Sequence, residues 1–157
     1  RGEGVMPEWK TEMQEIKIGT GRKLKDGQDI AILSFGHVGN FAASAIRDVK
    51  AEGINPAHYD MRFVKPLDEE MLHEVFSKYN KVITIEDGTV VGGFGSAILE
   101  FMNEHGYKAD VKIMGIPDRL VEHGTPKQLY DEIGIDANGI ADMLRVLSKI
   151  NVAELIK

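Results

Sequence analysis

The sequence predicts an α/β fold with a mostly parallel five-stranded sheet, one antiparallel edge strand and helices on both faces, in a three-layer α/β/α arrangement. Short apolar runs alternate along the chain with segments whose apolar residues recur at helical spacing. The run from Asp29 to Phe35 is apolar at almost every position, which is typical of a parallel strand buried on both faces.

The expected elements follow from these patterns and from the residues between them. Residues 16–25 alternate apolar and polar side chains around two glycines, so we expect a short edge strand that forms a hairpin-like start with the next strand. The other strands are expected at residues 29–35, 57–63, 82–85 and 111–116, and helices at 40–52, 69–78, 96–104, 126–133 and from 137 to about 147. Gly53 fits a helix end, and Asp68, Thr125 and Asp136 fit helix starts.

Composition limits the function. The chain has 157 residues, which suits one domain, and a net charge of −6, which argues against a nucleic-acid surface. It has no cysteine, which removes disulfides, thiolate catalysis and cysteine metal sites and favours a cytoplasmic location. No apolar run approaches the ~18 residues of a membrane span, so no membrane association is expected.

The two ends of the chain differ from its middle. Residues 1–14 show no periodicity and do not begin with Met, so we expect a linker from a longer polypeptide. We expect residues 15–150 to form the domain and residues 151–157 to be a C-terminal tail.

The segment from Val82 to Ser96 predicts a buried strand, an acidic turn and a glycine-rich entry into a helix. A dinucleotide site needs G-x-G-x-x-G directly after the strand, but Ile98 stands where the third glycine belongs. Glu86 and Asp87 would also repel a pyrophosphate. We therefore expect these glycines to let the chain turn and the helix lie close to the sheet.

Polar side chains are expected at the carboxyl edge of the sheet, where open α/β sheets bind ligands. The basic candidates for a small-anion or partner site are Arg62, Lys65, Arg119 and His123. Glu86 is a candidate acid–base group, because partial burial would raise the pKa of a carboxyl.

Each candidate also has a structural explanation. An ion-pair network with Asp60 and Asp68 would order the loop that carries Arg62 and Lys65. His123 would form a hydrogen bond to nearby backbone, and Glu86 would accept hydrogen bonds from N–H groups of the glycine-rich segment. Gly95-Ser96-Ala97 is not a nucleophile elbow, so no complete active site is predicted.

Three motifs occur in order at characteristic distances: Asp60–Asp68, Thr84–Ser96 and Gly115–Gly124. Together they resemble the C-terminal domain of the transketolase superfamily. The Pro-Asp-Arg…His-Gly loop and the segment Leu129–Asp136 are most similar to the 1-deoxy-D-xylulose-5-phosphate synthases. The resemblance extends over nearly the whole chain, from residue 1 to about residue 150.

The resemblance implies a three-domain homodimeric enzyme that condenses pyruvate with glyceraldehyde 3-phosphate and releases carbon dioxide, in isoprenoid-precursor and thiamine biosynthesis. Thiamine diphosphate and Mg²⁺ would supply the chemistry from the first two domains. This chain would then hold no cofactor and no metal, would be inactive alone, and would support the dimer and its neighbouring domain. Residues 1–14 would be the linker from a pyrimidine-binding domain.

The resemblance also implies roles for single residues. Arg1-Gly2 resembles the end of the family's Tyr-Pro-Arg-Gly segment, which implies that Arg1 holds the phosphate of glyceraldehyde 3-phosphate through its planar guanidinium. The family's catalytic glutamate belongs to the second domain, so Glu86 is not given that role.

Two alternatives stay open. The chain could be the matching domain of a transketolase or of a 2-oxoacid dehydrogenase β subunit. It could instead be a stand-alone module that binds a small anion between Arg62, Lys65, Arg119 and His123.

Overall fold

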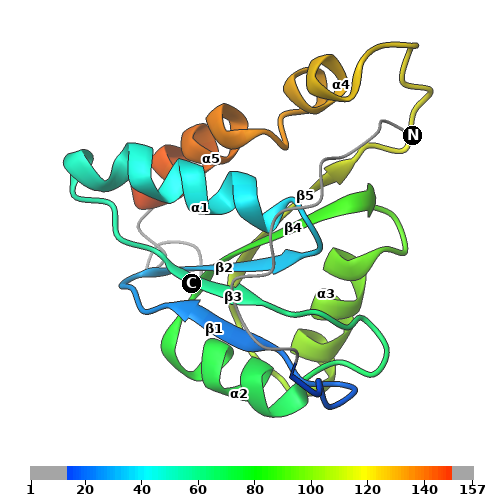
Figure 1. The fold of residues 1–157 in the computed structure, drawn as a ribbon. Helices are drawn as coiled ribbons and strands as arrows, with labels where there is room; N and C mark the ends of the chain where they lie inside the picture. Colours follow the sequence, from blue (N-terminus) through cyan, green and yellow to red (C-terminus); the bar gives the residue numbers. More distant parts are fainter. Residues whose placement is uncertain (1–13, 150–157) are drawn as a thin grey trace.

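The computed structural model describes residues 14–149 and shows a five-stranded sheet between two helical layers (Figure 1). The strand order is β1-β3-β2-β4-β5. Four strands are parallel, and the edge strand β1 runs antiparallel to β3. The predicted fold class is therefore confirmed. The strands are β1 (Arg22–Lys25), β2 (Ile30–Phe35), β3 (Ala57–Asp60), β4 (Lys81–Thr89) and β5 (Asp110–Ile116). All but the last residue of the expected linker, and the whole expected tail, lie outside the described residues.

The helices divide between the two faces of the sheet (Figure 1). α1 and α5 cover one face, α2 and α3 cover the other, and α4 lies beyond the carboxyl end of β5. A 3-10 turn, η1, follows α1 and ends at Gly53, which has the left-handed conformation expected of a helix end (φ 80°). The helices are α1 (Gly39–Val49), η1 (Lys50–Glu52), α2 (Glu69–Lys78), α3 (Phe94–Glu104), α4 (Pro126–Ile133) and α5 (Ala137–Lys149).

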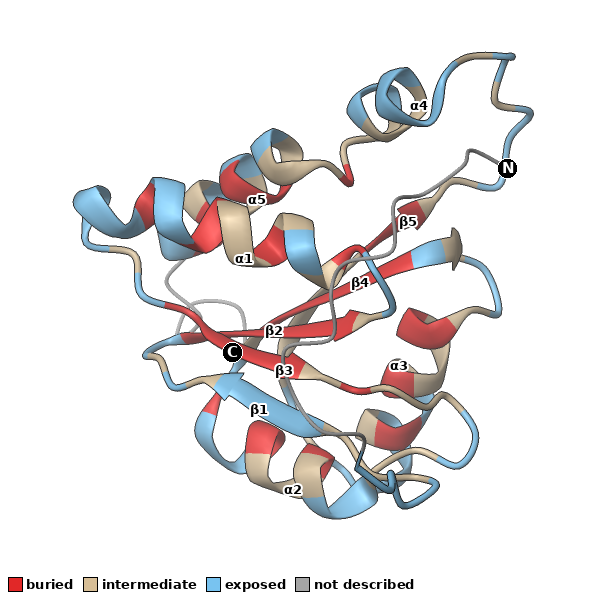
Figure 2. Cartoon of the chain, in the orientation of Figure 1, coloured by how far each residue is buried: buried red, intermediate tan, exposed pale blue. Residues whose placement is uncertain are grey.

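The core consists of two apolar clusters separated by the sheet. Successive residues of a strand point to opposite faces, so the continuous apolar run of β2 supplies both clusters. Ile30 and Ile32 pack under α1 and α5, whereas Ala31 and Leu33 pack under α2 and α3. Figure 2 shows the resulting band of buried residues along the central strands.

The three helix caps predicted from the sequence are present, whereas α3 begins at Phe94, two residues before its predicted start. The Asp68 side chain accepts the N–H of Met71, and the Asp136 side chain accepts the N–H of Gly139. Thr125 and Gln128 cap each other's backbone N–H groups ahead of Pro126. These side chains satisfy N–H groups that the first turn of a helix leaves without a partner.

The antiparallel edge strand is shorter than predicted and has a different neighbour. Only Arg22–Lys25 is a strand, because the chain turns at Gly19 (φ 79°) and the N–H of Gly21 bonds to Asp68. The predicted hairpin-like start, with residues 16–25 beside the 29–35 strand, is wrong. β1 pairs with β3 instead, so β3 lies between β1 and β2 in the sheet.

Two further strand ends differ from the prediction. The strand expected at 57–63 ends at Asp60, since Arg62 has a positive φ of 55° that interrupts an extended strand. The strand expected at 82–85 continues to Thr89, which pairs with Ile116 after an irregularity in the ladder. Glu86 and Asp87 therefore belong to a strand and not to an acidic turn.

Glu86 joins the end of β4 to the start of α3. The side chain is buried, and its two oxygens accept the N–H groups of Phe94 and Gly95, each at 2.9 Å. A carboxylate at a helix N-terminus also meets the positive end of the helix dipole. The expectation that Glu86 bonds to backbone N–H groups of the glycine-rich segment is confirmed.

We expect Glu86→Gln to destabilise the chain by about 1–3 kcal/mol, because an amide NH₂ replaces one acceptor and leaves a buried N–H without a partner. Urea unfolding followed by circular dichroism measures the change. Glu100→Gln, at an exposed position of α3, is the matched control and should change the unfolding free energy little. Equal effects of the two variants would contradict this role of Glu86.

Ser34 and His58 form a buried polar pair on the face of the sheet that carries α1. The Ser34 Oγ lies 2.9 Å from His58 Nε2 and donates to the carbonyl of Tyr59 at 3.2 Å. His58 is only 2% exposed. Burial lowers its pKa to about 4, against a smaller raising effect of Asp60.

Stability should consequently depend on His58 in acid. An unfolded histidine has a pKa near 6.5, so the unfolded chain takes up the proton first as the pH falls. The contribution of neutral His58 is complete above pH 6.5 and is lost between about 6.5 and 4, by up to ~3 kcal/mol. Unfolding curves from pH 7.5 to 4 should be flatter for His58→Gln than for the natural sequence. Parallel curves would show that His58 does not cause the loss.

Candidate functional site

The carboxyl ends of the four parallel strands meet at one edge of the sheet. The loops that follow β2, β3, β4 and β5 therefore form this edge (Figure 1), and the loops after β3 and β5 carry the four basic candidates, whereas Glu86 lies within β4. We call it the carboxyl edge.

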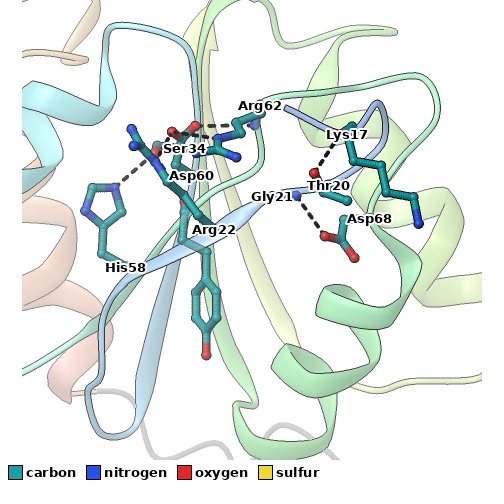
Figure 3. A network of polar contacts seen from close by, with 10 residues as sticks. Lys17, Thr20, Gly21, Arg22, Ser34, His58, Asp60, Arg62 and Asp68 are labelled. Carbon is teal, nitrogen blue, oxygen red and sulfur yellow. Dashed lines mark hydrogen bonds and ion pairs between the residues drawn. The ribbon is translucent and has the colours of Figure 1, made fainter. Parts of the chain in front are cut away.

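Asp60 holds two arginines at the end of β3 (Figure 3). The Arg22 Nε lies 2.9 Å from Asp60 Oδ2, and the Arg62 Nε lies 4.0 Å from the same oxygen. The Arg62 N–H also donates to Asp60 Oδ1 at 3.3 Å. The expected ion pair between Arg62 and Asp60 is confirmed, whereas Asp68 is used in capping α2 and Lys65 is exposed.

Arg119 and His123 lie in the loop between β5 and α4. The Arg119 guanidinium is 2.9 Å from a carboxylate oxygen of Glu132, at the end of α4, and His123 is exposed. This salt bridge links the loop after β5 to the end of α4. It lies on the surface, where such pairs contribute little to stability.

The structure does not bring the four basic candidates into one cluster. β2 and β4 lie between β3, which precedes Arg62, and β5, which precedes Arg119. Three steps between strands correspond to about 14 Å. Each arginine also has its own carboxylate, so a joint anion site of Arg62, Lys65, Arg119 and His123 has no geometric support.

A polar contact that the sequence did not predict occupies the middle of the edge. The Tyr130 hydroxyl donates to Asp87 Oδ2 at 3.0 Å and lies 3.1 Å from His37 Nε2. Since the hydroxyl has one hydrogen, the histidine is the donor in the second bond. Burial, and then the bond to Asp87, raise the pKa of Tyr130. The rings of His37, Phe41 and Tyr130 lie against one another, so this contact anchors α4 to β4 and α1.

No sequence signal could have revealed that contact. His37 follows β2, Asp87 belongs to β4 and Tyr130 belongs to α4, and up to 93 positions separate them in the chain. Only the strand order brings them together.

A groove of about 610 Å³ lies beside Asp60, between β1 and the start of α1. The charged residues of its lining are Arg22, Asp60 and Arg62. Its apolar side is formed by Ile16, Leu24, Phe35, Ala43 and Phe63. The arginine charges facing this groove are partly neutralised by Asp60.

The described residues offer little to a metal or a cofactor. Within residues 14–149, no three His, Asp or Glu side chains gather as metal ligands do. The N–H groups at the start of α3, which would suit a diphosphate, are already bonded to Glu86. No described helix combines the length and apolar character that crossing a membrane requires. Arg1 lies outside the described residues.

Comparison with known proteins gives relatives along almost the whole chain. A 1-deoxy-D-xylulose-5-phosphate synthase of Cytophaga hutchinsonii is 57% identical over 150 residues, covering 96% of this chain and 24% of that protein. The synthase of Geobacillus thermodenitrificans is 42% identical over 148 residues, covering 94% of this chain and 24% of that protein. The chain thus spans about a quarter of the length of the curated relatives it matches.

A solved structure shares the fold. It is described as a split-gene transketolase in an inactive beta4 tetramer, and it matches with a TM-score of 0.79 at 31% identity. The match covers 85% of this chain and 44% of that one. The family model for the transketolase C-terminal domain matches residues 19–140. The chain therefore belongs to the transketolase C-terminal domain family.

Proposed function

We propose that this chain is the C-terminal domain of a 1-deoxy-D-xylulose-5-phosphate synthase and serves it as a scaffold. The observation that carries the proposal is the 57% identity to such a synthase along 96% of the chain. Other relatives at 40–53% identity bear the same name. This supports the synthases over a transketolase or a 2-oxoacid dehydrogenase β subunit.

The whole protein would join pyruvate to glyceraldehyde 3-phosphate with loss of carbon dioxide, as a homodimer in the cytoplasm. Thiamine diphosphate, bound with Mg²⁺, would supply carbanion stabilisation. The described residues do not fit these groups, because Glu86 already bonds the N–H groups at the start of α3 and no carboxylate cluster is available. No catalytic step is therefore assigned to them.

The scaffold role rests on what the edge residues do. Arg62 and Arg119 form ion pairs within the chain, and Glu86 organises the start of α3. Lys65 and His123 are exposed in edge loops, where they are available to the rest of the protein. Arg1 is proposed, from the family resemblance alone, to hold the substrate phosphate.

Leu120 is the clearest apolar candidate for contact with the rest of the protein. It is 92% exposed in the loop that also carries Arg119 and His123. An exposed leucine contributes nothing to the core of this chain, but burying it at an interface is worth about 1.5–3 kcal/mol.

The isolated 157-residue chain is expected to bind no thiamine diphosphate in calorimetry and to form no product from the two substrates. The full-length protein, with Mg²⁺ present, should do both under the same conditions. Saturable heat or turnover with the isolated chain would contradict the scaffold role, and an inactive full-length protein would contradict the assignment to the synthases.

Leu120→Ser should weaken the assembled full-length protein by about 2 kcal/mol while leaving the unfolding free energy of the isolated chain nearly unchanged. Thermal unfolding of both proteins and sedimentation of the full-length one measure this. Val146→Ser is the matched control, because Val146 is a half-exposed apolar residue on α5, away from the edge. An unaffected full-length Leu120→Ser protein would place Leu120 outside any interface.

A further inference from the structure

A second hollow of about 460 Å³ lies between α1 and the end of β1. It shares Leu24 and Ala43 with the groove beside Asp60 but extends away from the carboxyl edge, toward the turn before β3. Leu24, Ala43, Ile46 and Ile54 form its apolar walls. Its volume suits a small molecule.

Three cationic side chains line this hollow: Lys25, Arg47 and Lys50. The chain as a whole carries a net charge of −6, so such a concentration of positive charge is unusual for it. None of the three has an ion pair with a carboxylate among residues 14–149. Unneutralised positive charge around a concave surface attracts anions.

The neighbouring carboxylates are engaged elsewhere. Asp26 is 3.3 Å from the Lys23 ammonium, and Glu52 is bonded to the Arg145 guanidinium through both oxygens. Asp48 follows Arg47 directly on α1, and adjacent helical residues do not face each other.

The cations differ in how they are held. The Lys25 ammonium donates to the carbonyls of Asp26 and Pro56 and to the Asn55 side chain, so it is a fixed charge with all three hydrogens in use. Burial, and then repulsion from Lys50, lower the pKa of Lys25, against a smaller raising effect of the Asp26 carboxylate. Arg47 and Lys50 are exposed and have donors left for a ligand.

His58 supplies an acceptor to the same hollow. The single hydrogen of the Ser34 hydroxyl goes to the Tyr59 carbonyl, so the His58 Nε2 must donate to Ser34. The neutral ring therefore has its free electron pair on Nδ1, which points away from Ser34 (Figure 3). Nδ1 has no hydrogen-bond partner in the described chain, although His58 is 98% buried and lines the hollow. Among the described residues the buried side-chain atoms without a partner are Thr84 Oγ1 and Asp110 Oδ2, so His58 Nδ1 is open to the hollow and can accept a hydrogen bond from a ligand there.

We propose that the hollow binds a small phosphate monoester that carries a hydroxyl group. The phosphate lies between Arg47 and Lys50 in the field of Lys25, and the hydroxyl donates to His58 Nδ1. A dianionic headgroup matches several cations, and the apolar walls accommodate the carbon chain. This binding goes beyond the proposed scaffold role and involves no turnover.

Titration of the 157-residue chain with sn-glycerol 3-phosphate at pH 7 and constant ionic strength tests the proposal. The ¹⁵N resonance of His58 Nδ1 should shift as the hydroxyl bonds to it, and calorimetry should give a saturable affinity. Inorganic phosphate and glycerol, the two halves of the probe, should each bind at least tenfold more weakly. Equal affinity for inorganic phosphate, or saturation without a change at Nδ1, would overturn the proposal.

The double variant Arg47→Gln/Lys50→Gln removes two exposed cations and should weaken glycerol 3-phosphate binding at least tenfold. Lys65→Gln/Arg119→Gln removes the same charge at the carboxyl edge and is the matched control. Circular dichroism should show both variants folded. Loss of binding in the control, or retained binding in the first variant, would place the anion elsewhere and refute the site.

Discussion

Burial of the central strands on both faces is the constraint on which the other features of this chain depend. Ile32 and Leu33 are adjacent in sequence, both are completely buried, and they belong to different apolar clusters. Neither cluster can form without the sheet between them, and the sheet cannot be shielded from water without helices on each side. The loops after β2, β3 and β4 start from these strands, and the loop after β5 starts from the strand beside β4, so the positions of the polar side chains at the carboxyl edge follow from the same packing.

The glycine-rich segment shows how one local geometry can serve two purposes. A strand, a glycine-rich turn and a helix N-terminus together make a place where an anion is favoured. Here the anion belongs to the chain, because the buried Glu86 carboxylate bonds to the N–H groups of Phe94 and Gly95. Gly95 is needed for the close approach, since a Cβ there would lie 2.7 Å from Thr84 Oγ1 and 2.6 Å from Ile113. The motif that resembles a nucleotide-binding loop thus has a structural role, because its N–H groups are already bonded to Glu86.

Sequence patterns predicted what depends on neighbours along the chain. Helix caps at Asp68 and Asp136 and the two-sided burial of β2 are local properties, and the structure confirms them. The sequence did not predict that β1 pairs with β3, because strand order depends on contacts between segments that are distant in the chain. The contact between His37 and Tyr130 was missed for the same reason. The spacing of apolar residues gives no information about strand order or about this contact. Contacts between residues distant in sequence can be identified only from the folded structure.

The polar groups of the carboxyl edge already have partners within the chain. An acid–base group is useful when its partner can be exchanged for a substrate. Asp60 already lies between two arginines, and Asp87 accepts a hydrogen bond from the Tyr130 hydroxyl. Both carboxylate oxygens of Glu86 accept backbone N–H groups. Releasing any of them would cost the fold a contact that positions a loop or a helix. His58, whose Nδ1 has no partner within residues 14–149, lies on the α1 side behind the edge, where it lines the hollow together with cations and apolar walls. Such an arrangement is suited to binding an anion rather than to transforming it.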